Sequence, residues 1–262
     1  MSRYLRLLAL QWRTSLLLAM QYRADFLVDG ALSVLFTATA TIPLFVVFGR
    51  QTELEGWTFG EALVVTGWFT LLQGVMEGAI NPSLSAVVEH IRKGTLDFVL
   101  LKPADAQFLV STARFSPWRA TAIVNALVVF AIAFHRLGRP PSLGGIALAL
   151  VMLVVAVAVL YALWILTVSA AFYVVRVDNL TFLFGSIFDF ARWPASVFRG
   201  AVAFVFTFII PLALMTTYPA EAMLGRLEPH KLALSLVAAV VVSWIARRVW
   251  LRSIARYTSA SS

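Results

Sequence analysis

Long apolar stretches alternate with short polar ones along most of the chain. A helix needs about 20 apolar residues to cross the hydrocarbon layer of a bilayer, and five stretches reach or approach that length. They cover residues 26–48, 60–80, 117–134, 145–174 and 232–250. The pattern therefore predicts an all-α, polytopic membrane protein.

Two further apolar pieces lie between the fourth and fifth of these stretches. Residues 180–191 are apolar but short, and residues 201–218 are bracketed by Pro194 and Pro219. Backbone that enters a membrane without crossing it is tolerated where protein or a water-filled cavity covers it. We predict six transmembrane helices, the fifth of them short, and a re-entrant extracytoplasmic segment at 194–220 before the last span.

The first 24 residues have a different pattern, in which basic and polar side chains share one helical face. This face contains Arg3, Arg6, Arg13, Thr14 and Gln21. Leucines and Trp12 lie elsewhere, as in helices that lie in the membrane interface, although Gln11 and Ser15 interrupt the apolar side. We predict an interfacial helix over 1–24 that is not a cleaved secretion signal, followed by a single transmembrane domain over 25–262. The alternative is an extension of the first span.

Composition and charge support a membrane protein over a soluble one. The chain is 61% hydrophobic and 13% charged, whereas soluble domains are about 25% charged. The net charge of +8 does not indicate a nucleic-acid partner, because the basic residues lie beside apolar runs rather than on one face. Placing both termini in the cytoplasm puts 13 of the 21 basic residues in inner segments and seven in outer ones, as the positive-inside rule requires.

The chain lacks the sequence signatures of ATP hydrolysis and metal catalysis. A phosphate-binding P-loop needs a lysine directly after a glycine. The only lysines are Lys93, Lys102 and Lys231, and none follows a glycine. The three histidines lie in separate loops, there is no cysteine, and no Gly-x-Ser-x-Gly elbow occurs. We predict no catalytic residue and no metal site.

The segment between the second and third spans carries the most specific pattern. Residues 81–103 read NPSLSAVVEHIRKGTLDFVLLKP. Asn81 followed by Pro82 is typical of a helix start, Gly94 of a helix end, and Thr95 of the cap of a second short helix. The pattern predicts an amphipathic helix, a Gly-Thr turn and a second helix.

The stretch 91–103 resembles the cytoplasmic loop of type-2 ABC exporter permeases, in which an isoleucine-x-x-Gly-Thr-Leu-acidic run leads to leucines and a proline. The resemblance extends over most of the chain, including the basic N-terminal helix, the six spans and the proline-containing re-entrant stretch. Arg192-Trp193-Pro194 and the later prolines are similar to a subgroup often encoded as two permeases beside one ATPase.

The resemblance implies a permease subunit of an ATP-driven exporter in the bacterial cytoplasmic membrane, paired with a second permease, identical or paralogous, and surrounded by lipids. A separate ABC ATPase subunit, which holds the ATP and magnesium, would dock on residues 81–103 of the cytoplasmic coupling loop 81–115, while this chain binds no cofactor. The cargo would be amphipathic or lipophilic. By position, the coupling residues are Glu89, His90, Arg92, Lys93, Gly94, Thr95, Leu96 and Asp97. The alternative is a solvated basic loop without a docking role.

Polar residues inside predicted spans are candidates for the substrate pathway, because ionisable groups in lipid are costly. Besides Glu77 near the inner end of the second span, they are Asn125 in the middle of the third and Asp189 with Arg192 toward the outer end of the fifth. The structural alternative is that Asp189 and Arg192 neutralise each other, that Asn125 bonds a neighbouring helix, and that Glu77 is wetted at the interface. Small residues such as Ser33 in the first span suit a close interface between permeases.

Two other classes of function fit a polytopic protein. An ion-coupled transporter usually has carboxylates or broken helices near the midplane, whereas the acidic residues here lie mainly toward span ends and loops. A membrane-embedded enzyme needs clustered catalytic groups, and the sequence shows no such cluster. The exporter subunit is therefore the favoured hypothesis, with a self-sufficient ion-coupled transporter or a non-transporting scaffold as alternatives.

Overall fold

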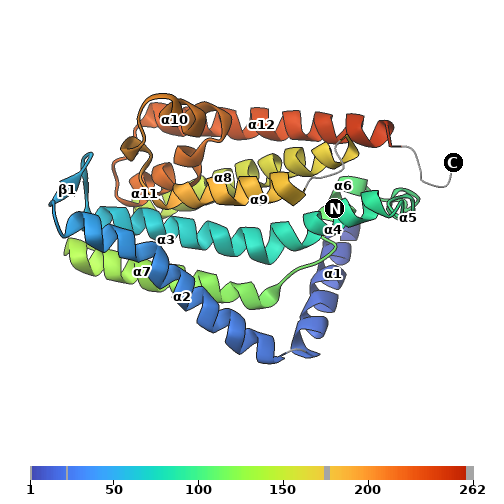
Figure 1. Cartoon of the computed structure of the whole chain (residues 1–262), viewed down its shortest axis with the longest axis horizontal. Coiled ribbons are helices and arrows are strands. Elements are labelled where there is room, and N and C mark those ends of the chain that lie inside the picture. Colours follow the sequence, from blue (N-terminus) through green and yellow to red (C-terminus); the bar gives the residue numbers. More distant parts are fainter. Residues whose placement is uncertain (1, 22, 174–177, 258–262) are drawn as a thin grey trace.

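The computed structural model describes residues 2–21, 23–173 and 178–257, which form a bundle of long helices (Figure 1). The predicted end of the fourth span at residue 174 lies outside the described residues. The long helices are α1 (Ser2–Gln21), α2 (Arg23–Phe48), α3 (Phe59–Val75), α4 (Asn81–Arg92), α7 (Thr121–Leu137), α8 (Leu143–Ser169) and α12 (Pro229–Ala255). The short elements are β1 (Glu53–Leu54), β2 (Trp57–Thr58), α5 (Asp97–Leu100), α6 (Ala106–Ser111), α9 (Asp178–Phe188), α10 (Gly200–Phe204) and α11 (Tyr218–Met223).

Five helical segments in the described part of the chain are long and apolar enough to cross a membrane. They are Leu27–Phe48, Phe59–Arg92, Pro117–Leu137, Leu143–Phe172 and Pro229–Ala255. These segments coincide with the five long stretches of the sequence and confirm a polytopic, nearly all-α protein. Helix α9 with the turn that follows it, Asp189–Arg192, extends only about 22 Å at 1.5 Å per residue. A sixth crossing therefore stays a prediction.

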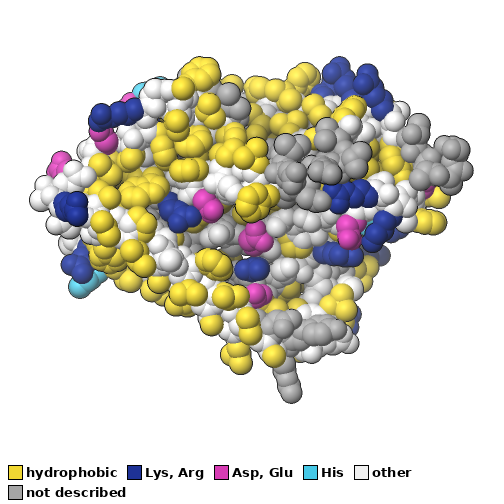
Figure 2. All heavy atoms as spheres, in the orientation of Figure 1, with side chains coloured by type: hydrophobic (Ala, Val, Ile, Leu, Met, Phe, Trp, Pro, Cys, Tyr) yellow, Lys and Arg dark blue, Asp and Glu magenta, His cyan; other side chains and the backbone are white. Residues whose placement is uncertain are grey.

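The bundle has two distinct ends. The hairpin end carries β1 and β2, the start of α3 and the loop between α7 and α8 (Figure 1). The opposite end, here called the α4 end, carries α4, α5, α6 and the last turns of α12. Apolar side chains cover much of the surface, and several Lys and Arg side chains gather over the end of α12 (Figure 2).

Helix α3 lies at the centre of the bundle and packs closely on α7. Three glycines seven residues apart, Gly60, Gly67 and Gly74, face α7, and a Cβ at Gly67 would lie 2.5 Å from the Phe130 ring. A Cβ at Gly74 would lie 2.8 Å from Ala122. Small residues let helix backbones approach where lipid gives no hydrophobic driving force between helices, so this glycine row sets the distance between α3 and α7.

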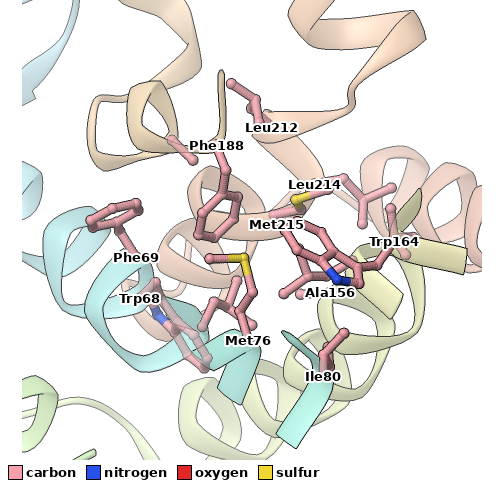
Figure 3. Close-up of a cluster of buried hydrophobic side chains, with 14 of the residues drawn as sticks. Trp68, Phe69, Met76, Ile80, Ala156, Trp164, Phe188, Leu212, Leu214 and Met215 are labelled. Atoms are coloured by element: carbon pink, nitrogen blue, oxygen red, sulfur yellow. The ribbon is translucent and has the colours of Figure 1, made fainter. Parts of the chain in front are cut away.

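The segment 194–220 begins and ends at the hairpin end. Arg199 is paired with Glu55 of the hairpin loop, and Arg226, just after the segment, donates to Glu61 at 3.0 Å. Between these points Leu212, Leu214 and Met215 pack beside Trp164 and Phe188 in the buried cluster of Figure 3. The Thr216 hydroxyl donates to the carbonyl of Ala191 at 2.7 Å. The segment thus enters the core and returns to the same end of the bundle.

Helix α1 runs crosswise to α3 and α8 (Figure 1) and docks on the chain that leads into α7. The Thr112 hydroxyl donates to the Gln11 side chain at 2.6 Å, and the Phe115 amide donates to the Ser15 hydroxyl at 3.0 Å. These bonds explain the two polar residues that interrupt the apolar side of α1. Trp12 is exposed on the same helix. The placement of α1 in a membrane interface stays a prediction.

The glycine row gives a test of the α3–α7 contact. Gly67→Ala should lower the free energy of unfolding of the protein in detergent by about 1–3 kcal/mol, because the added methyl group collides with Phe130. Shortening the neighbour in Gly67→Ala/Phe130→Leu should restore part of the loss. Gly144→Ala in α8, where an added Cβ meets nothing within 4 Å, is the matched control and should be neutral or slightly stabilising. Equal behaviour of Gly67→Ala and Gly144→Ala would contradict the packing.

Candidate functional site

The second span and the first helix of the loop after it form one continuous helix. A π-helical turn, Met76–Ile80, joins α3 directly to α4, and Ile80 and Asn81 both have right-handed helical dihedral angles. The prediction that Asn81 caps a new helix is therefore wrong. Pro82 lacks an amide hydrogen and its ring crowds the carbonyl four residues earlier. The wider π turn relieves this crowding, and the carbonyl of Gly78 accepts instead from the Ser116 amide at 2.8 Å.

A ladder of polar side chains follows one face of this continuous helix. Asn81 donates to the two carboxylate oxygens of Glu77 at 3.2 and 3.4 Å, and its own side-chain oxygen accepts from Ser85 at 2.7 Å. Gln73 lies one turn before Glu77. Residues four apart share a helix face, so the sequence already contained this signal, but the expected cap at Asn81 divided it between two elements.

The polar ladder forms one wall of a cavity of about 470 Å³. The facing wall belongs to α9 and the turn after it, and α8 closes the side. The lining residues are Gln73, Met76, Glu77, Asn81, Ser85, Val88, Trp164, Val168, Phe182, Gly185, Ser186 and Asp189. A concave site of this size, with polar groups set among apolar and aromatic ones, is suited to a drug-sized ligand.

Asp189 and Arg192 lie together in the turn that follows α9. Arg192 Nη2 is 3.3 Å from Asp189 Oδ1, Arg192 Nε donates to the Asp189 carbonyl at 2.7 Å, and the guanidinium lies 5.2 Å from the Phe69 ring centre. We expected both residues toward the outer end of a span. Asp189 directly follows the last residue of α9 and lines the cavity, and its position relative to a membrane stays a prediction.

Asn125 lies in a different place. Its side-chain amide donates to the Ser33 hydroxyl at 2.8 Å and so ties α7 to α2. It lines a separate, mainly apolar cavity of about 240 Å³ together with Thr37 and Thr41. The structure therefore brings Asp189 and Arg192 together and leaves Asn125 apart from them, in the role that the structural alternative describes.

The turn after α4 is built by Gly94 and Thr95. Gly94 has a positive φ of 65°, and the Thr95 amide donates to the His90 carbonyl at 2.9 Å. These are the features of a glycine-terminated helix. The Thr95 hydroxyl lies 2.8 Å from His90 Nδ1, while α5 starts after Leu96 without a side-chain cap. The predicted helix end at Gly94 is confirmed, and the predicted capping role of Thr95 is wrong because its hydroxyl pairs with His90.

The predicted coupling residues differ in their exposure. Glu89, Arg92 and Lys93 are exposed, and the 3.8 Å pair of Glu89 with Lys93 adds little stability in solvent. Asp97 and Gly94 are half-buried and Leu96 is fully buried. Leu96 therefore holds the turn against the core rather than presenting a side chain to solvent.

Two apolar side chains stand out on this polar loop. Phe98 is 70% exposed and Leu101 is 81% exposed. Both come from α5 or the residue directly after it, beside the charged end of α4. The coupling residues assigned by position did not include this pair, since the spacing alone did not show which residues of the run 98–101 face outward.

The loop is held by Asp105, which caps α6. Its carboxylate accepts from the Phe108 amide at 3.0 Å and from both terminal nitrogens of Arg247 in α12, one of them at 3.2 Å. Burial disfavours the charged form of Asp105, but the hydrogen bonds from Arg247 and Phe108 outweigh it, so the pKa of this carboxyl lies below its usual value. Tyr4 of α1 accepts from the Asp105 amide at 3.3 Å. One residue thus joins α6, α12 and α1.

Comparison with known families decides what kind of protein carries this arrangement. The family model described as ABC-2 family transporter protein matches residues 34–261. The chain belongs to the ABC-2 family. This confirms the resemblance and gives the protein as a permease component of an ABC transporter, a transmembrane and generally non-catalytic part. No curated protein and no solved structure matches the chain.

The turn of this ABC-2 permease at Gly94 gives a second test. Gly94→Ala forces a side chain into a left-handed conformation, at a cost of about 1–2 kcal/mol, and should speed amide hydrogen exchange across residues 93–101 by roughly tenfold. Gly138→Ala is the matched control, because Gly138 has a similar φ of 67° at the other end of the bundle. It should change exchange only around the end of α7. Unaltered exchange at 93–101 in Gly94→Ala would show that the turn does not depend on glycine.

Proposed function

We propose that this chain is the membrane-spanning subunit of an ATP-driven exporter and that a separate ATPase subunit drives it through residues 81–103. One observation supports this most directly. The continuous helix Phe59–Arg92 is about 51 Å long at 1.5 Å per residue, against about 30 Å of hydrocarbon. It carries the cavity wall along residues 73–88 and the loop at its end, so force applied to the loop acts on the cavity through one continuous helix.

The proposed orientation places the α4 end in the cytoplasm and the hairpin end outside a bacterial cytoplasmic membrane. Basic residues at the α4 end support it under the positive-inside rule, among them Lys93, Lys102, Arg248, Arg252 and Arg256. Helix α9 then rises from the cytoplasmic side to mid-depth. The turns after it continue to Arg199 at the hairpin end, which completes a broken fifth crossing, and 194–220 is the re-entrant segment.

Single cysteines test this topology cleanly, because the natural chain has none. Cysteines placed at Arg199 and at Arg226 should both react with an impermeant maleimide added outside intact cells. A cysteine at Lys93 should react only after the membrane is opened. Opposite labelling of the positions 199 and 226 would refute the re-entrant path, and labelling of position 93 from outside would refute the docking of a cytoplasmic ATPase.

The surface formed by the exposed end of α4 and by Phe98 and Leu101 is the proposed docking site for the ATPase. Exposed apolar side chains on a polar loop are typical of an interaction surface. Glu89, Arg92 and Lys93 surround them with charge that can fix the orientation of the partner. In this proposal ATP and magnesium are bound by the ATPase and no cofactor by this chain.

The docking surface predicts that Phe98→Ala/Leu101→Ala lowers the amount of ATPase that copurifies with the permease by roughly tenfold, since a few side chains that become buried at the centre of an interface carry most of its binding energy. The double charge reversal Arg92→Asp/Asp97→Arg should act in the same direction. Leu143→Ala, at an 87% exposed apolar residue of the hairpin end, is the control. An ATPase retained by the loop variants, or transport driven by an ion gradient without an ATPase, would rule out this coupling.

The remaining parts of the proposal concern the partner permease and the path. Helix α2 is largely exposed, and its face of small residues suits a second permease, identical or paralogous, with lipids around the pair. The substrate path runs along the 470 Å³ cavity. In it Asp189 faces the substrate, Arg192 holds Asp189 in place, and Asn125 acts at a distance by joining α7 to α2.

A further inference from the structure

The charge of the cavity wall is one-sided. Its lining includes two carboxylates, Glu77 and Asp189, and no Lys, Arg or His among the described residues. An anionic group placed there would meet like charge at Glu77, whereas a cationic group would meet opposite charge; at the other wall Asp189 is paired with Arg192. The lining therefore disfavours phosphate-bearing or carboxylate-bearing ligands.

Glu77 and Asp189 differ in how far the protein neutralises them. Asp189 has the guanidinium of Arg192 at 3.3 Å. Among the described side chains, Glu77 is bonded only to the neutral amide of Asn81. An ionised carboxylate among membrane-spanning helices is costly unless a cation compensates it. Arg119 shares a small neighbouring cavity with Glu77 but is paired with Asp29 at 3.8 Å. Among the described residues no cation is therefore bonded to Glu77, and a ligand can supply one.

The rest of the lining suits an apolar body attached to the cation. Met76, Val88 and Val168 are apolar, and Phe182 is 78% exposed at the cavity. Trp164 is 2% exposed, and its indole nitrogen is buried without a hydrogen-bond partner. Aromatic rings attract cations that come within about 6 Å of their faces.

We propose that the cavity recognises an amphipathic organic cation, with a protonated amine or quaternary nitrogen against Glu77 and an apolar or aromatic body against Trp164 and Phe182. This assignment rests on the proposed function in that it treats the cavity as the exporter's substrate path. Asp189 is a second, weaker anchor because Arg192 already compensates it. The π turn at Met76–Ile80 places Glu77 on the cavity face.

Two probes of opposite charge test the assignment on the purified permease in nanodiscs of neutral lipid, with empty nanodiscs subtracted. Ethidium is the cation and anilinonaphthalene sulfonate the anion, and both are read by fluorescence titration. Glu77→Gln should weaken ethidium binding at least tenfold, Asp189→Asn about threefold, and Glu77→Asp less than either. Glu53→Gln, at an exposed carboxylate of the hairpin, should leave ethidium binding unchanged.

Two further variants separate charge from shape and keep the test decisive if Glu77→Gln fails to fold. Ser85→Lys adds a cation to the wall at an exposed position; it should weaken ethidium binding and strengthen binding of the anion. Gly185→Leu fills the cavity at a site where an added Cβ meets nothing within 4 Å, and should weaken both probes. Ethidium binding that is the same in Glu77→Gln or Ser85→Lys as in the natural protein, or a loss equal for both probes in these variants, would overturn the proposal.

The outcome is separable from that of the proposed function because no ATPase is present in the titration. Glu77-dependent ethidium binding in a permease to which no ATPase binds would leave the cation site standing and remove the exporter. The opposite result is an ATPase that docks on the loop while ethidium binding is the same in Glu77→Gln as in the natural protein. It would leave the exporter standing and remove the cation site.

Discussion

The structure depends on the passage of one helix through a proline without a break. Pro82 removes a backbone donor in the middle of Phe59–Arg92, which would ordinarily end or kink a helix. Two features compensate. The π turn Met76–Ile80 widens the backbone, and the Ser116 amide donates a hydrogen bond to the Gly78 carbonyl at 2.8 Å. Because the chain leading into α7 supplies this bond, the rigidity of the helix and the position of that chain are set together.

The same helix also organises the membrane core. Its glycine row brings α7 close on one side, and on another side Thr66 lies 3.5 Å from the Arg192 carbonyl after α9. The buried residues of 212–215 fill the space next to this contact (Figure 3). A broken helix such as α9 leaves backbone carbonyls unpaired at membrane depth, where water cannot satisfy them. The hydroxyls of Thr66 and Thr216 donate to these carbonyls. The broken helix after α9 is therefore tolerated only beside this bundle.

The sequence was sufficient for the features that depend on local composition and insufficient for those that depend on distant partners. Apolar length placed the five long spans, and Gly94 marked the end of α4, because each is decided by the residues themselves. Asn81 was misassigned because a capping preference is weaker than a backbone bond from Ser116, which no local pattern contains. Gln11 interrupts the apolar side of an amphipathic helix, and its role became clear only from the structure, where it accepts a hydrogen bond from Thr112. The cavity depends on α9 lying opposite α4, and no pattern in the sequence predicts that arrangement.

The anchoring of the loop at Asp105 bears on how force would enter the protein. This residue binds α12 through Arg247 and α1 through Tyr4, and α1 in turn is bonded along the chain toward α7. A push on α4 and α5 would therefore reach α12, α1 and α7 as well as α3. Packed and hydrogen-bonded elements transmit displacement as rigid units rather than by continuous deformation. A loop tied at several points to the bundle can move the cavity wall against α9, the short element that packs on the core through Phe184 and Phe188.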